Sequence, residues 1–170
     1  MPESRLPEPW LRGTHTDFAP VQRAVLHALE LAKEDLEKWC GNFTDEQLNA
    51  RPAGLAPVAF HVRHIARTID RLLTYAEGRD LSDEQMSALR TELDADATRD
   101  AVFGELASAL AKSTVRIRAL DKSSLEESRT VGKKQLPSTV GGLLVHIADH
   151  TQRHVGQAIT TAKVVVAQHS

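Results

Sequence analysis

The sequence has little of several features that define common classes of protein. Cys40 is the single cysteine among 170 residues, which excludes a disulfide framework or a cysteine-based zinc site within one chain. Long apolar runs are lacking, and residues 1–16 are rich in proline and charge. We therefore expect neither a membrane-spanning helix nor a signal peptide, and we predict a cytoplasmic protein.

The chain also has no large excess of either charge and has few aromatic residues. The formal net charge is −2, basic and acidic residues alternate along the chain, and aromatic residues make up 4%. A nucleic-acid-binding surface needs a basic stripe or a set of base-stacking rings, so we expect no nucleic-acid partner. The sequence does have 41% hydrophobic and 26% charged residues, which fits one soluble domain spanning residues 1–170.

Apolar residues recur at intervals of three and four in four long segments, and this spacing is typical of amphipathic helices. Short helices are predicted at 44–47 and 83–89, while the polar connection 121–138 contains no convincing strand. Residues 1–16 should form an irregular arm, pinned by Trp10. The long helices are expected at Phe18–Cys40, Pro57–Glu77, Thr98–Leu120 and Thr139–Val166. This pattern predicts an all-α four-helix bundle with short extra helices in the connections.

Several helix ends carry residues that are typical of such positions. Asp17 is predicted to cap the first helix, and Pro57 is predicted to occupy the first position of the second, which should end before Gly78. Thr44 and Gln47 have the spacing of a capping box. These residues set the boundaries expected for the helices.

The last long segment carries His150 and His154 within its apolar stripe. On a helix, a separation of four residues places both imidazoles on one face, about one turn apart, so that both can bind a single ion. If they were core residues only, each ring would need partners at both nitrogens. A shared metal satisfies one nitrogen of each ring, and imidazole suits Zn, Ni, Cu or Fe. We favour the metal interpretation.

A third ligand must come from elsewhere in the chain. On the second long helix, His61 lies near the centre of the apolar stripe and His64 on its flank. Periodicity slightly prefers His61, whereas an off-axis polar site would favour His64. His146, at the edge of the last stripe, could be a ligand, a proton shuttle or a boundary residue. The remaining histidines are interpreted as solvated: His15, His27 and His169.

His64-Ile65-Ala66 early in a helix, followed far downstream by His150-x-x-x-His154-x-Gly156-Gln157, resembles the DinB/YfiT-like superfamily of metal-dependent bundle proteins. The resemblance covers nearly the whole chain. It implies a four-helix bundle with an unusual winding and a divalent metal bound by His64, His150 and His154, with positions open to water. Zn or Ni is the expected metal, with Fe or Mn as alternatives. The resemblance also implies a homodimer.

Three histidine ligands with open positions are typical of catalytic metal sites. The resemblance implies a metal-dependent enzyme acting on a small molecule, either as a hydrolase or as a transferase of a low-molecular-weight thiol such as bacillithiol or mycothiol. Candidate catalytic residues are His146, His61 and Tyr75, with Thr68 and Gln157 as orienting groups. No carboxylate falls clearly on the inward faces of the two ligand-bearing helices.

Two other classes of function remain open. One is a non-catalytic metal- or ligand-binding bundle, such as a stress-related accessory protein, which predicts a closed coordination sphere or no adjoining pocket. The other is a helical interaction module whose histidines are core residues. That interpretation predicts that stability does not depend on metal.

Overall fold

A computed structural model describes residues 6–94 and 97–168 and confirms the predicted all-α four-helix bundle. Two shorter helices, α2 (Asp45–Asn49) and α4 (Asp83–Arg90), lie in the connections. Single 3-10 turns occur at Pro9–Leu11, Pro52–Gly54 and Lys122–Ser124. The bundle itself consists of α1 (Pro20–Cys40), α3 (Val58–Ala76), α5 (Arg99–Ala119) and α6 (Val140–Gln168). Within the described ranges, no helix combines the length and apolar character needed to cross a bilayer.

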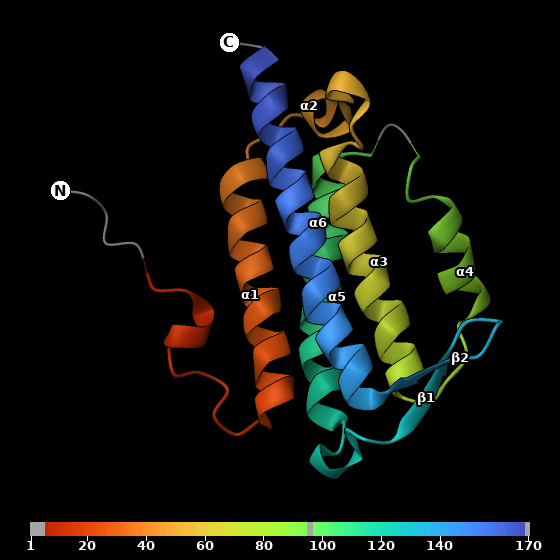
Figure 1. The fold of residues 1–170 in the computed structure, drawn as a ribbon. Coiled ribbons are helices and arrows are strands. Elements are labelled where there is room, and N and C mark those ends of the chain that lie inside the picture. The colour runs from red at the N-terminus through yellow and green to blue at the C-terminus, as the bar shows by residue number, and fades with distance from the viewer. Residues whose placement is uncertain (1–5, 95–96, 169–170) are drawn as a thin grey trace.

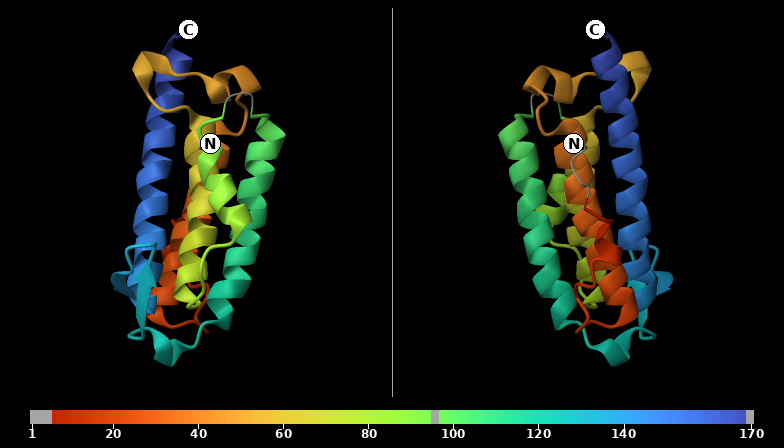
Figure 2. Two further views of the ribbon diagram at one scale, coloured as in Figure 1. Left: turned by 90° about the vertical axis from the view of Figure 1, so that its right-hand side faces the viewer. Right: turned by 90° about the vertical axis from the view of Figure 1, so that its left-hand side faces the viewer.

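The winding of the bundle differs from a simple up-and-down order. α6 packs against both α1 and α3, and α5 packs mainly against α3. The colours in Figures 1 and 2 show that α1 and α6 run in one direction and that α3 and α5 run in the other. Because the neighbours α3 and α5 are parallel, the chain must return along α3 before α5 can begin. It does so through α4, which lies beside α3 (Figure 1).

Aliphatic side chains from all four long helices fill the core. Each buried leucine or isoleucine contributes about 1.5–3 kcal/mol relative to an exposed one, so this core is the main source of stability. The spacing of these residues is the one that the sequence pattern predicts for inward faces. Members that are less than 2% exposed include Leu36, Ile65, Ile69, Leu73, Ile117, Leu144 and Ile147.

Two helices have N-caps other than the predicted ones. α1 begins at Pro20 with Ala19 as its N-cap, and Asp17 instead pairs with Arg118 of α5 at 3.1 Å. Proline suits the first helical position because it lacks the N–H that would be unpaired there, so the helix starts at Pro20. Pro57 is the N-cap of α3 rather than its first residue.

Two other helix ends follow the prediction. The Thr44 hydroxyl accepts a hydrogen bond from the backbone N–H of Gln47 at 3.2 Å, which confirms the capping box of α2. Gly78 follows Glu77, the C-cap of α3, and adopts a φ of +73°, a conformation that ends helices.

The connection between α5 and α6 contains a β-hairpin, so the prediction of no strand was wrong. β1 (Ser128–Val131) pairs antiparallel with β2 (Leu136–Thr139). Both strands are four residues long and contain no buried residue, and they lack the alternation of apolar and polar residues that marks a strand in a sequence. The hairpin is tied to the end of α3 by Arg129, whose Nε donates to the carbonyl of Ala76 at 2.8 Å.

The N-terminal arm is held to α1, but not by Trp10 as predicted. The Trp10 side chain is 61% exposed, and its ring N–H donates to Glu8 of the arm itself. Arg12 instead donates to both carboxylate oxygens of Glu34, at 2.6 and 2.8 Å. A two-pronged ion pair therefore fixes the arm against the helix.

Two histidines expected to be solvated lie at this same contact. His27 is only 7% exposed, and His15 is half-buried, with its Nε2 2.6 Å from a Glu30 oxygen. The interpretation of both as solvated was wrong because the arm folds over this face of α1. His169 lies outside the described residues.

Candidate metal centre

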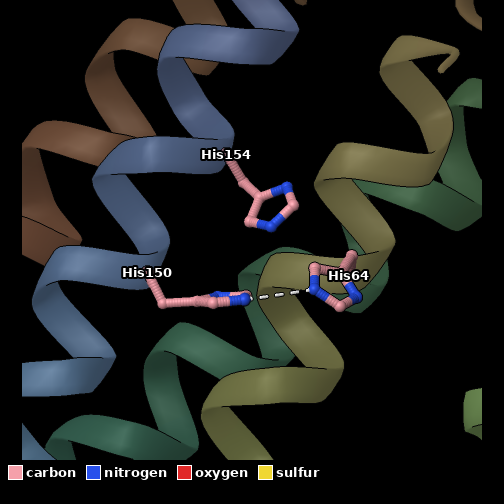
Figure 3. A group of neighbouring side chains, drawn as sticks. All are labelled: His64, His150 and His154. Atoms are coloured by element: carbon pink, nitrogen blue, oxygen red, sulfur yellow. Dashed lines mark hydrogen bonds between the residues drawn. The ribbon is translucent and has the colours of Figure 1, made fainter.

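Three histidines converge between α3 and α6. His64 comes from α3, whereas His150 and His154 are one turn apart on α6 (Figure 3). One ring nitrogen from each lies within 4.8 Å of the other two, and all three side chains are partly exposed. The structure thus brings together the three residues that the family resemblance implies as ligands.

The distances between these rings fit a single transition-metal ion. Nε2 of His64 lies 3.2 Å from Nε2 of His150. Two nitrogens bound to one tetrahedral zinc stand about 3.3 Å apart, because each Zn–N bond is about 2.0–2.1 Å. The His154 ring is centred 4.4 Å from His64 and 4.5 Å from His150, and one of its nitrogens points toward the gap between them (Figure 3). The donor set is therefore suited to a divalent ion.

A buried carboxylate lies behind His64. Oε2 of Glu92 is 2.6 Å from Nδ1 of His64, and Oε1 accepts a hydrogen bond from Arg71 at 2.7 Å. Glu92 is only 5% exposed. A carboxylate on the outer nitrogen of an imidazole holds the proton there and leaves the lone pair on Nε2, which is the arrangement that metal-ligating histidines require.

Glu92 is ionised where it lies. Burial by itself would raise the pKa of its carboxyl, but hydrogen bonds from His64 and Arg71 outweigh burial and hold the pKa below its ordinary value. Arg71 is held in place by Thr68, whose hydroxyl accepts a hydrogen bond from its guanidinium at 2.9 Å. Thr68, expected to orient a catalytic group, therefore supports the arginine behind Glu92.

Sequence reasoning missed Glu92 because it follows α4 in a polar connection and has no place in a helical stripe. Its position depends on the return of the chain along α3, which no local pattern reveals. The prediction that no carboxylate lies on the inward faces of the ligand-bearing helices considered α3 and α6 only. The carboxylate comes from a third segment.

His61 lies behind His154 in a similar way. The Nδ1 atoms of the two rings are 3.0 Å apart, and His61 is 5% exposed. Because Nδ1 of His154 faces His61, its Nε2 is the nitrogen that points toward His64 and His150 (Figure 3). Phe60 stacks on His64 with ring centroids 5.2 Å apart and covers one side of the group.

Burial and proximity keep these imidazoles uncharged. The pKa values of His61, His150 and His154 are each lowered to about 4, first because burial disfavours the charged ring and then because nearby positive charges, chiefly other histidines, repel it. All three rings are neutral at pH 7. Neutral imidazole is the form that binds metals.

The other candidate residues are not all near this centre. The His146 side chain is 48% exposed, and its ring is centred 5.4 Å from that of His150. Gln157 is exposed on α6. Tyr75 lies eleven residues beyond His64 on α3, which corresponds to about 16 Å along a helix, and it lines a different cavity with Arg129. The structure therefore places His61 and His146 beside the ligand-type histidines, and Tyr75 elsewhere.

A cavity of about 320 Å³ lies between α3, α4 and α5. Its lining includes Arg67, Arg71, Glu105 and Arg116, but none of the three histidines. Arg71 is the connection between the two features, since its guanidinium also donates to Glu92. The cavity and the imidazole group are thus linked through Arg71 and Glu92.

Fold and site together define an all-α bundle with a three-histidine candidate metal centre. The sequence model of the DinB superfamily matches residues 28–158, a range that includes all three histidines, and the chain belongs to this superfamily. A crystal structure of a conserved protein from Enterococcus faecalis is similar, with a TM-score of 0.70 and 22% identity over 88% of this chain and 99% of that one. At this identity the likeness concerns the fold alone. The search of curated proteins found no significant match.

Proposed function

We propose that this protein is a metal-dependent enzyme that acts on a small molecule. The observation that carries the proposal is the convergence of three imidazoles, two of which have their outer nitrogens held by Glu92 and His61. Structural metal sites are usually closed by four protein ligands, whereas three ligands leave a position for water or substrate. The arrangement therefore favours a reaction centre over a purely structural one.

The ligands would be His64, His150 and His154, and the ion Zn or Ni, with Fe or Mn as alternatives. When bound, such an ion supplies Lewis acidity, which lowers the pKa of a coordinated water or thiol. Glu92 keeps the proton of His64 on Nδ1, and His61 fixes the ring of His154. Both are positioning residues, because they act through a ligand. Phe60 excludes water from one side of the group.

His146 is the residue we propose for proton transfer. It lies beside His150 at the exposed side of the group, where a substrate can approach, and an imidazole can both donate and accept a proton. Tyr75 has no part in this proposal, because it lies about three helical turns from His64. Hydrolysis and transfer of a low-molecular-weight thiol, such as bacillithiol or mycothiol, would use the same open positions.

The first test is the metal content of tag-free protein by mass spectrometry, for the wild type and for His64→Ala, His150→Ala and His154→Ala. We expect each variant to lose one equivalent of metal while circular dichroism shows an intact helical fold. His146→Asn is the matched control, since it removes an exposed histidine of the same helix and should retain the metal.

Wild-type protein that is metal-free, stays folded and gains no thermal stability from Zn or Ni would overturn the metal centre and leave a bundle with histidines in its core. If metal is bound at these residues, panels of hydrolysis and thiol-transfer substrates follow. Turnover that falls in His146→Asn at unchanged metal content supports the enzyme. Metal binding without turnover in either panel favours the non-catalytic metal-binding alternative.

A further inference from the structure

A second group of ligand-type side chains lies where the N-terminal arm meets α1, and the proposed function does not use it. The group consists of His15 from the arm and of His27 and Glu30 from α1. One ligand atom from each lies within 4.8 Å of the other two. These residues share no contact with the three-histidine centre.

Local backbone geometry explains how the group forms. His27 and Glu30 are three residues apart on α1, so they share one face of the helix. Gly13 and His15 adopt φ values of +68° and +58°, which turn the arm back onto that face. The left-handed conformation is uncommon for a residue other than glycine, and histidine is among those that adopt it more often. The turn places the His15 ring 5.5 Å from the His27 ring.

The donor atoms of this group are close together and partly shielded. Nε2 of His15 is 2.6 Å from Oε1 of Glu30, and Nε2 of His27 is 3.0 Å from the hydroxyl of Thr14. The His27 residue is 7% exposed, whereas the side chains of His15 and Glu30 are 21% and 40% exposed. Two imidazoles and a carboxylate are a donor set found in zinc sites, with a fourth position left for water.

The surrounding charges leave the carboxylate of Glu30 available to a cation. Arg12 is neutralised by its two contacts with Glu34, and Lys33 lies 3.8 Å from Glu37. Lys33 also shares a small cavity of about 80 Å³ with His15 and Glu30, and Arg12 interacts electrostatically with Glu30, so both positive charges oppose an ion there. A separate cavity of about 290 Å³ is lined by His27, Thr14 and Arg23. It gives an ion access to His27 from solvent.

From this geometry we propose that His15, His27 and Glu30 form a second site for a divalent transition metal, with Zn²⁺ favoured by the donor set. The ligands come from two segments, so the complete site exists only when the arm is docked on α1. Binding therefore stabilises the docked arm by mass action. The role is structural, and it differs from the three-histidine centre in both location and consequence.

Native mass spectrometry of a Zn²⁺ titration tests the proposal. We expect two ions per chain in the wild type, one in the triple variant His64→Ala/His150→Ala/His154→Ala, and one in His15→Asn. Asparagine is chosen because it tolerates the left-handed conformation of His15 while removing the imidazole. Glu30→Gln, which keeps the size of the side chain, should also lose one ion. In the triple variant, Zn²⁺ should slow tryptic cleavage after Arg12.

Two control variants separate ligand loss from disturbance of the arm. Glu34→Gln weakens the ion pair with Arg12 but keeps all three donors, so it should retain both ions. His146→Asn removes an exposed histidine that belongs to neither group and should also retain both. Circular dichroism of each variant checks that the helices remain formed.

The possible outcomes distinguish this proposal from the proposed function. One ion in the wild type and none in the triple variant would overturn the second site and leave the three-histidine centre intact. One ion that survives in the triple variant and is lost in His15→Asn would support the second site and overturn the first. A stoichiometry unchanged by both His15→Asn and Glu30→Gln would overturn the second site.

Discussion

Replacement of Glu92 tests how the candidate centre holds His64. Its two carboxylate oxygens contact Nδ1 of His64 and the guanidinium of Arg71, at 2.6 and 2.7 Å. Glutamine keeps the shape and one oxygen, so it can hold His64 or Arg71 but removes the negative charge that both favour. Alanine removes the hydrogen bonds as well. Comparing the two substitutions therefore separates the effect of the negative charge from the effect of the hydrogen bonds.

Removal of a residue that hydrogen-bonds to a metal ligand lowers the metal affinity about 10–100-fold. We expect Glu92→Gln to weaken Zn²⁺ binding at the three-histidine centre about tenfold and Glu92→Ala close to 100-fold, which correspond to about 1.4 and 2.7 kcal/mol. The side chains of Glu92 and Arg71 are 6% and 11% exposed. Removing one partner of such a buried pair costs about 3–5 kcal/mol, so Glu92→Ala should also lower the free energy of unfolding by an amount near the lower value.

The measurement is competition with a chelating dye, in a His15→Asn background so that only one site is counted, with urea unfolding in parallel. Glu105→Gln is the matched control, because Glu105 accepts hydrogen bonds from Arg67 at 2.6 and 3.3 Å and contacts none of the three histidines. It should leave the Zn²⁺ affinity unchanged. An affinity of Glu92→Gln within twofold of the wild type would show that the carboxylate does not hold His64 for metal binding.

Three further outcomes are expected. His61→Leu leaves Nδ1 of His154 without its partner and should weaken Zn²⁺ binding about tenfold in the same competition assay, and unchanged affinity would contradict the positioning role. In the metal-free protein, His61, His150 and His154 have pKa values near 4 against an ordinary 6.5, so the unfolded chain binds more protons between these values. The free energy of unfolding should be highest above pH 6.5 and should fall as the pH drops toward 4. A urea midpoint at pH 5 equal to or above that at pH 7 would contradict this. Leu144→Ala, at a side chain that is fully buried, should cost about 2–5 kcal/mol in urea unfolding at unchanged metal stoichiometry, and a cost below 1 kcal/mol would contradict the core assignment.

The helical framework was predictable because it depends on local spacing. Apolar residues at intervals of three and four located all four long helices, and the same rule placed His150 and His154 on one face. The choice between His61 and His64 was not decided by periodicity, since both lie on α3 and face α6. The structure separates them by depth: His64 reaches the gap between the helices, and His61 lies behind His154.

Features that depend on the path of the connections were not predictable. Glu92 reaches His64 only because the chain returns along α3, and a polar residue in a polar segment gives no sign of that. The hairpin is short and has no buried residue in its strands, so it lacks an apolar pattern. His15 meets His27 because of a left-handed turn in the arm, and the conformation of a single residue leaves no periodic trace in a sequence.

The position of α6 between α1 and α3 has a consequence for biosynthesis. α6 is the last of the four bundle helices to leave the ribosome, and at about 5–20 residues per second its 29 residues take a few seconds to appear. Until then the nascent chain carries only one of the three clustered imidazoles, and the faces of α1 and α3 that α6 covers stay open to chaperones. We therefore expect a chain truncated before Val140 to bind no ion at this centre and to be recognised by chaperones.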